Sequence, residues 1–280
     1  MYKNLILLVV LAVTIACVAG SVLAPSRLEE PFTNSSGSSV PMIIVQTHRY
    51  KRLDDVPSPL HEIMSNLRDA HPEWEYRYYN DDEQREFIER HMSTRVLAAY
   101  DAINPAYSAA RADLFRYVVV YVNGGVYLDC KSGLTLGRSL DLLRLEGRLV
   151  TAHWNRIRPH ASEVGLPHGE YVNWCIAAPP SDPMLLATID RVVENIEREQ
   201  QLPESARGTG KLSVLRITGP IAFTQASLAK HRELYGTAPP TRRVREYGLQ
   251  YTANGKHPDK MKPWHYERQT GPVVLNSDVA

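Results

Sequence analysis

The side chains best suited to chemistry lie in two neighbouring segments, 110–117 and 124–132. Asp113 and Arg116 are three residues apart, a spacing that places a carboxylate and a guanidinium on the same face of a helix. A Gly-Gly turn and a short apolar strand then lead to Asp129, so these polar groups can converge at the end of that strand. Each residue by itself fits a plain structural interpretation, as a surface ion pair or a strand end. Their ordered combination favours a functional site.

Short apolar runs alternate with amphipathic stretches in the body of the chain. We expect strands over 42–45, 74–79, 126–129, 149–152 and 174–178. We expect helices over 60–67, 83–103 in two pieces, 108–122, 183–196 and 220–231. This alternation predicts an α/β sheet with helices on both faces and a ligand site beyond the carboxyl ends of its strands.

Residue types at the element boundaries add three local expectations. Ser58 is expected to cap the first helix, with Pro59 in its first turn, and Asp182 is expected to open the helix that starts at Pro183. After Gln200 the chain is turn-rich, and residues 208–211 are expected to form a loop.

Length and composition describe an ordinary globular protein. The 280 residues are 44% hydrophobic and 22% charged, which suits one domain of catalytic size with a buried core. The formal net charge is +1, so no broad positive field is available to face many phosphates. A nucleic-acid partner is therefore not expected.

The N-terminal region reads as a membrane anchor and stem. Residues 5–24 carry no charge, and as a helix they would rise about 30 Å, enough to cross a bilayer core. With Lys3 before the span, we expect residues 1–25 to anchor a type II protein of the Golgi or secretory-pathway membrane, with a lumenal body. A cleaved signal peptide is the alternative. Residues 26–40 are expected to be a flexible stem, and 41–280 the catalytic domain.

The folded body contains Cys130 and Cys175. Two buried thiols are the expected state, and a single disulfide is the chemically allowed alternative in an oxidising lumen.

The ordered pair of segments around Asp113, Arg116 and Asp129 resembles glycosyltransferase family 32. These sugar transferases carry a DxD motif and include the yeast initiating α-1,6-mannosyltransferase. The resemblance spans residues 40–265, with weaker similarity at 41–47, 176–179, 218–220 and 264–266.

The resemblance implies a GT-A fold with a mixed sheet flanked by helices. It implies retaining transfer of a hexose (mannose, galactose or glucose) from a UDP- or GDP-sugar to a glycan or lipid-linked hydroxyl. It implies that Asp129 is catalytic and binds Mn²⁺ or Mg²⁺ beside the diphosphate. The other residues that it implies bind the donor are Gln46, Thr47, Asp113, Arg116, Tyr127, Lys131 and His265.

The chain departs from the family pattern at one position, because Lys131 stands where the second aspartate of the motif is expected. Losing a carboxylate and gaining a cation should weaken metal binding. Three outcomes stay open: Lys131 replaces part of the metal charge, Lys131 points away while Asp129 holds the metal, or the protein is inactive. Metal-assisted catalysis by Asp129 is the first expectation.

Two further functions remain as alternatives to that reading. One is an inactive lumenal binding or scaffold protein, and the other is an inositol-phosphoceramide mannosyltransferase. The latter is disfavoured here because no apolar run after Ala24 is long enough for further spans. The histidines show no metal-ligand spacing and receive no role, namely His48, His153, His160, His168 and His257.

Overall fold

The computed structural model describes residues 39–155, 160–253, 255, 262 and 265–276, all of which belong to the compact unit Gly37–Ala280. The expected anchor (1–25) lies outside the described residues, as does nearly all of the expected stem (26–40). Within the described part of the chain, no helix is long and apolar enough to cross a membrane.

A four-stranded mixed sheet with the order β2-β1-β3-β6 forms the centre of this unit. Its strands are β1 (Ile43–Thr47), β2 (Glu75–Tyr79), β3 (Gly125–Leu128) and β6 (Cys175–Ala178). Strand β1 runs parallel to β2 and β3, whereas β6 runs antiparallel to β3. The carboxyl ends of β1 and β3 therefore share one sheet edge with the amino end of β6. That edge places Thr47, Asp129 and Asn173 near one another.

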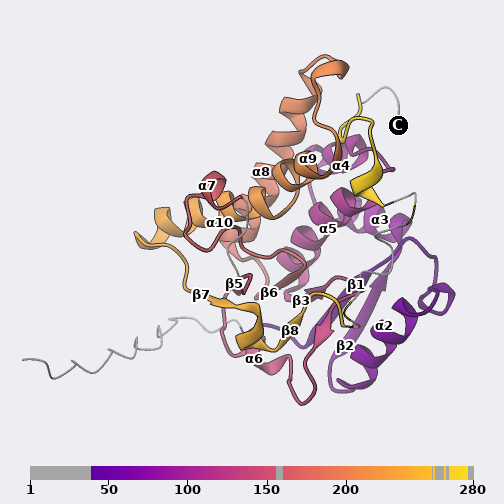
Figure 1. Cartoon of the computed structure of the whole chain (residues 1–280), viewed down its shortest axis with the longest axis vertical. Coiled ribbons are helices and arrows are strands. Elements are labelled where there is room, and N and C mark those ends of the chain that lie inside the picture. Colours follow the sequence, from indigo (N-terminus) through magenta and orange to yellow (C-terminus); the bar gives the residue numbers. More distant parts are fainter. Residues whose placement is uncertain (1–38, 156–159, 254, 256–261, 263–264, 277–280) are drawn as a thin grey trace, which may run out of the picture. The chain divides into compact units, whose positions relative to one another are not determined.

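Side chains alternate between the two faces of the sheet, as the two-residue period of a strand requires. Val45, Tyr127 and Ile176 pack on one face, against α5 and α8. Val126 and Cys175 pack on the other face, in a cluster that includes side chains from α2 and α6. Figure 1 shows these helix pairs on opposite sides of the central strands. The expected α/β class, with helices covering both faces of a mixed sheet, is confirmed.

The described helices are α2 (Leu60–Asp69), α3 (Asp81–His91), α4 (Thr94–Ala102), α5 (Ser108–Asn123), α6 (Asp141–Arg144), α7 (Ala161–Val164), α8 (Pro183–Gln200), α9 (Gly210–Ile217) and α10 (Pro220–Tyr235). Two small sheets pair β4 (Gly133–Leu134) with β8 (Leu249–Gln250) and β5 (Thr151–His153) with β7 (Thr241–Arg243). Short 3-10 helices cover Leu53–Asp55, Glu204–Ala206, Val244–Tyr247 and Tyr266–Arg268.

Two glycines at the end of α5 let the chain turn back into the sheet. Gly124 and Gly125 have φ values of +67° and +95°, in the region that side chains disfavour. A Cβ on Gly125 would lie 2.7 Å from the backbone oxygen of Ile43. The close pairing of β3 with β1 therefore requires glycine, and it sets the position from which Asp129 emerges.

Some local expectations are wrong. The N-cap of α2 is Pro59, and the Ser58 hydroxyl instead donates to Glu62 at 2.6 Å. The loop expected over 208–211 is wrong for its second half, because helix α9 begins at Gly210 and buries Val214 and Ile217. By contrast, Asp182 caps α8 as expected, accepting hydrogen bonds from the amides of Met184 and Leu185.

The two cysteines of the body form no disulfide with each other. Cys175 is buried on β6, as expected, and burial raises the pKa of its thiol. Cys130 is half-buried, so the expectation of two buried thiols is wrong for this residue. Its position just after Asp129 places it at the sheet edge rather than in the core.

Candidate active site

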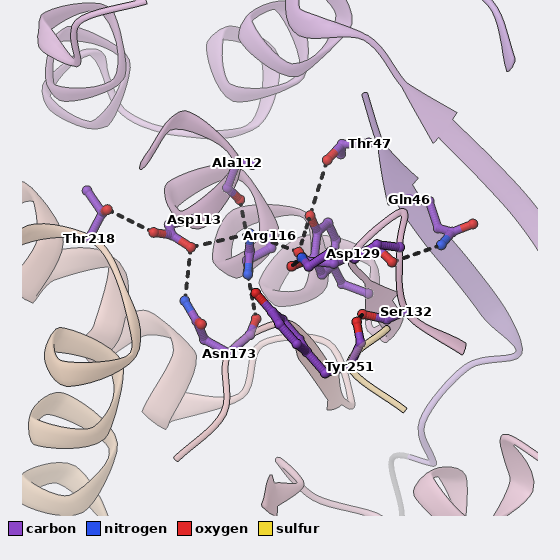
Figure 2. A network of polar contacts seen from close by, with 12 residues as sticks. Gln46, Thr47, Ala112, Asp113, Arg116, Asp129, Ser132, Asn173, Thr218 and Tyr251 are labelled. Atoms are coloured by element: carbon purple, nitrogen blue, oxygen red, sulfur yellow. Dashed lines mark hydrogen bonds and ion pairs between the residues drawn. The ribbon is translucent and has the colours of Figure 1, made fainter. Parts of the chain in front are cut away.

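A cleft of about 500 Å³ opens at the sheet edge where β1 and β3 end and β6 begins. Segments far apart in the sequence contribute its polar side chains. Seven of the predicted site residues line it, namely Thr47, Asp113, Arg116, Tyr127, Asp129, Lys131 and, from the C-terminal segment, His265. The polar network at its base is drawn in Figure 2.

Arg116 joins the two carboxylates of the site. Its Nη2 lies 3.3 Å from Asp113 Oδ1 and 3.1 Å from Asp129 Oδ1, and its side chain is only 5% exposed. Nε donates to the carbonyl of Ala112 at 3.1 Å, and Nη1 donates to the carbonyl of Asn173 at 2.8 Å. The three-residue spacing on α5 therefore places Asp113 and Arg116 together, as expected. The guanidinium is fixed in one orientation by carbonyls and carboxylates.

Asp113 is a buried carboxylate with both oxygens engaged. Its Oδ1 accepts from the side-chain amide of Asn173, and its Oδ2 accepts from the hydroxyl of Thr218, each at 2.9 Å. Burial raises the pKa of Asp113 to about 6, against the opposing effects of Arg116 and the Thr218 hydrogen bond. The carboxylate form is therefore the one that these neighbours hold at neutral pH.

Asp129 follows β3 and contacts cations through both of its oxygens. Besides the Arg116 contact, its Oδ1 accepts from the hydroxyl of Tyr127 at 3.3 Å, while Oδ2 accepts from the ammonium of Lys131. Burial acts to raise the pKa of Asp129, but Lys131 and Arg116 outweigh it and hold that pKa below its usual value. Asp129 is therefore an anion throughout the neutral range.

Lys131 turns into the site instead of pointing away, so the second of the three sequence alternatives is wrong. Its side chain is 9% exposed, and Nζ lies 4.5 Å from the centre of the Tyr251 ring. Burial works against the charge, but Asp129 and Tyr251 raise the pKa of Lys131 above its usual value. The lysine is therefore a permanent buried cation.

The residues at the end of β1 divide into one in the cleft and one behind it. The Thr47 hydroxyl lies 3.1 Å from the hydroxyl of Tyr127 and lines the cleft. Gln46 is wholly buried and outside the described lining; its Nε2 donates to the backbone oxygen of Asp129 at 3.3 Å. Its Oε1 accepts from Tyr76 at 2.9 Å. Gln46 thus contacts the backbone of Asp129 and does not line the cleft, whereas the resemblance implied that it binds the donor.

His265 reaches the cleft from the C-terminal segment, as expected. It is buried, and its Nδ1 accepts from the amide of Glu267 at 3.3 Å. Residue 264 of the similar C-terminal segment lies outside the described residues. His48 and His160, which received no role from spacing, also line the cleft.

Several cleft residues had no signal strong enough to be singled out from the sequence. Asn173 precedes β6, and its role as a partner of Asp113 requires knowing that β6 runs antiparallel to β3. Trp154 and Trp174 pack around Tyr251, with ring centres 5.3 and 5.5 Å from the tyrosine ring. Glu170 is 5% exposed, and its Oε2 has no hydrogen-bond partner among the described residues. These residues make an aromatic wall and leave one buried carboxylate oxygen unsatisfied.

The segment that carries Asp113, Arg116 and Asp129 is also the one that matches a known family. Residues 57–136 match the family model described as the glycosyltransferase sugar-binding region containing the DXD motif. Over these residues the chain is similar to that glycosyltransferase family. The mixed sheet and its flanking helices agree with the GT-A fold implied by the resemblance to family 32.

Named proteins are similar to part of this chain. Inositol phosphoceramide mannosyltransferase 3 of Schizosaccharomyces pombe is 34% identical over 114 residues, which are 41% of this chain and 30% of that protein. The mannosyl phosphorylinositol ceramide synthase of Saccharomyces cerevisiae is 33% identical over 104 residues, 37% of this chain and 25% of that one. The matches thus span about a third or less of these relatives.

Among solved structures, the PaToxG glycosyltransferase is similar with a TM-score of 0.47 and 15% identity. The alignment covers 71% of this chain and 72% of that chain.

A DXD glycosyltransferase family generally suggests a divalent metal, but the residues at this site do not fit one. Within the described part of the chain, no group of three or more His, Cys, Asp or Glu side chains could hold a metal ion. Both oxygens of Asp129 already contact cationic side chains. A divalent ion about 4 Å from the Lys131 ammonium would be repelled by about 8 kcal/mol at an effective dielectric constant of 20.

Proposed function

We propose that this glycosyltransferase moves a hexose from a nucleotide sugar to a hydroxyl acceptor with retention of anomeric configuration. The observation that carries the proposal is the buried chain Asp113–Arg116–Asp129–Lys131 at the base of the cleft. It lies within the family-matched segment and at the carboxyl ends of parallel strands, where open α/β sheets bind ligands.

Transfer requires a leaving group that gains negative charge. The bond between the anomeric carbon and the diphosphate oxygen breaks, and a bond between that carbon and the acceptor oxygen forms. The acceptor proton passes to the leaving diphosphate, so no separate protein base is needed. Lys131 lies in the cleft where it would stabilise the developing charge, and fixed cations of this kind lower such barriers strongly.

The carboxylates suit the sugar rather than the phosphates. Asp113 is fixed by Asn173 and Thr218, and an ionised carboxylate accepts hydrogen bonds from sugar hydroxyls. Asp129 is held by Tyr127 and Gln46 at the same edge of the cleft. We assign donor orientation to Asp113 and Asp129, with Arg116 keeping both carboxylates ionised.

The relatives favour one donor sugar and one class of acceptor. Both similar yeast proteins have names that specify mannosyl transfer to inositol phosphoceramide. Mannose from a GDP-linked donor, and a glycolipid hydroxyl, are therefore the first combination to test. UDP-hexoses and glycan acceptors remain in the test set.

Residues 1–25 would hold this activity at a secretory-pathway membrane. That placement is a proposal from their apolar composition. Alkaline carbonate extraction of the expressed chain tests it, because an anchored chain stays in the membrane pellet and a cleaved one is released.

The function is tested by giving the purified full-length chain a panel of UDP- and GDP-hexoses. A true donor should raise the melting temperature in proportion to its saturation and should be hydrolysed slowly without an acceptor. Stabilisation without hydrolysis or transfer would favour the inactive binding protein. No stabilisation and no hydrolysis with any donor would contradict the proposal.

A further inference from the structure

Lys131 places a positive charge beside Asp129, at the position where the family motif has a second carboxylate. Two motif carboxylates with a divalent cation sum to zero, from −2 and +2. Asp129 and Lys131 also sum to zero, from −1 and +1, with no ion added. Adding a divalent ion to the present pair would leave a net +2 in a buried place. The replacement of a carboxylate by an ammonium thus matches the removal of one divalent cation.

The Lys131 ammonium has donor capacity for a ligand. An ammonium carries three N–H donors. One is directed to Asp129 Oδ2, and the face of the Tyr251 ring lies 4.5 Å away on another side. Lys131 also lines the cleft, so a phosphate oxygen there can accept from it.

The lysine is held in place before any ligand arrives. Its carbonyl accepts from the amide of Ala253 at 3.0 Å, and the neighbouring Ser132 hydroxyl donates to the carbonyl of Tyr251 at 2.9 Å. The pairing of β4 with β8 continues this connection. A cation fixed in this way stabilises developing charge without reorganisation, as a bound metal does.

We propose that the Lys131 ammonium is the built-in cation of the diphosphate-binding site, and that this chain binds a nucleoside diphosphate without a divalent metal ion. The inference rests on the proposed function for the identity of its ligand. Its statement about the metal rests only on Asp129, Lys131 and Tyr251.

The metal part is tested with Mn²⁺ alone, followed by electron paramagnetic resonance of the free ion. The wild-type chain should leave the Mn²⁺ signal unchanged. Lys131→Asp restores the second carboxylate and should bind Mn²⁺. Lys230→Met, which removes a cation from the surface pair with Glu233 on α10, is the matched control and should behave as wild type. Binding of Mn²⁺ at this site by wild type would overturn the inference.

The ligand part is tested by calorimetric titration of the same proteins with UDP and GDP, in EDTA and in Mn²⁺. For wild type, the affinity should agree within about twofold between the two conditions. Lys131→Met keeps most of the aliphatic stem against Tyr251 and should weaken binding at least tenfold in EDTA, with no rescue by Mn²⁺. Circular dichroism checks that each variant is folded. A wild-type affinity at least tenfold higher in Mn²⁺ would overturn the inference.

Nucleotide binding and Mn²⁺ binding give separate answers. If wild type binds neither nucleotide with or without Mn²⁺, the proposed function falls and the ligand part falls with it. The Mn²⁺ titration of wild type and Lys131→Asp still decides whether the lysine has replaced the metal.

Discussion

The guanidinium of Arg116 lies 3.1 Å from the carboxylate of Asp129, joining the middle of α5 to the end of β3 inside a buried site. Twelve residues separate the two in the sequence, and they include the Gly-Gly turn. The chain reverses at that turn, and the parallel pairing of β3 with β1 then carries Asp129 to the sheet edge.

Removing the shared cation should destabilise the protein strongly. Arg116→Met leaves Asp113 and Asp129 buried with reduced compensation, and breaking a buried pair of this kind costs about 3–5 kcal/mol. Urea unfolding measures the change. The control is Arg95→Met, which breaks an exposed pair with Glu197 at 2.7 Å and should change the free energy of unfolding far less, because solvent screens that pair. Equal losses in the two variants would contradict the buried bridge.

The titration of Asp113 should appear in the pH dependence of stability. Because its folded pKa of about 6 exceeds the ordinary value of 3.8, the native state binds more protons between those values. The free energy of unfolding contributed by this group is therefore highest below pH 4 and falls by about 3 kcal/mol as the pH rises to about 6. Asp129, whose pKa is lowered, acts in the opposite direction and stabilises above its unfolded pKa.

Asp113→Asn should flatten this fall. Urea unfolding at several pH values between 4 and 7 compares the variant with wild type, and the difference in free energy of unfolding should shift in favour of the variant as pH rises. Curves that stay parallel across that range would show that Asp113 titrates normally.

Donor binding should weaken at acidic pH for the same reason. Protonated Asp113 keeps one acceptor oxygen and loses its charge, so nucleotide-sugar affinity should fall below about pH 6. Thr218→Val removes the hydrogen bond to Asp113 Oδ2 that favours the ionised form. The fall in affinity at acidic pH should therefore begin at a higher pH in this variant. Calorimetric titration between pH 5 and 8 measures both. If the affinity of Thr218→Val falls at the same pH as that of wild type, a group other than Asp113 is responsible for the fall.

The Gly-Gly turn should tolerate no side chain. Gly125→Ala combines a positive φ with a Cβ 2.7 Å from the oxygen of Ile43, so we expect a loss above about 3 kcal/mol from strain and overlap together. Gly147→Ala is the matched control, because φ is +62° there and nothing lies within 4 Å of the added Cβ. It should lose only about 1–2 kcal/mol. Thermal or urea unfolding separates the two effects.

The part of the site predictable from the sequence is the part built by local spacing. Asp113 and Arg116 share a helix face, and Asp129 follows the next strand, so their approach needs only the turn between them. That Thr47 lines the cleft while Gln46 does not could not be predicted from a run of apolar residues, because it depends on the register of β1 with β2 and β3.

Contacts between residues distant in the sequence could not be predicted for another reason. Asn173 and Thr218 contact Asp113 although they lie 60 and 105 residues away in the sequence. These contacts depend on the direction of β6 and on the presence of helix α9, and local sequence patterns predict neither. The sequence places Thr218 only in a turn that resembles one of the family. Tyr251 follows β8, a two-residue strand too short to carry any periodicity, yet its ring lies 4.5 Å from the Lys131 ammonium.

The role of Asp129 is tested by the turnover of a nucleotide hexose by wild type and Asp129→Asn, measured as nucleotide released per enzyme with the best donor of the panel. Asparagine keeps the shape of the side chain and removes the charge that pairs with Arg116 and Lys131. We predict measurable release by wild type and a loss of at least about 100-fold in the variant, which is the scale expected when a group that orients the donor is lost. Equal rates in the two proteins would contradict the account.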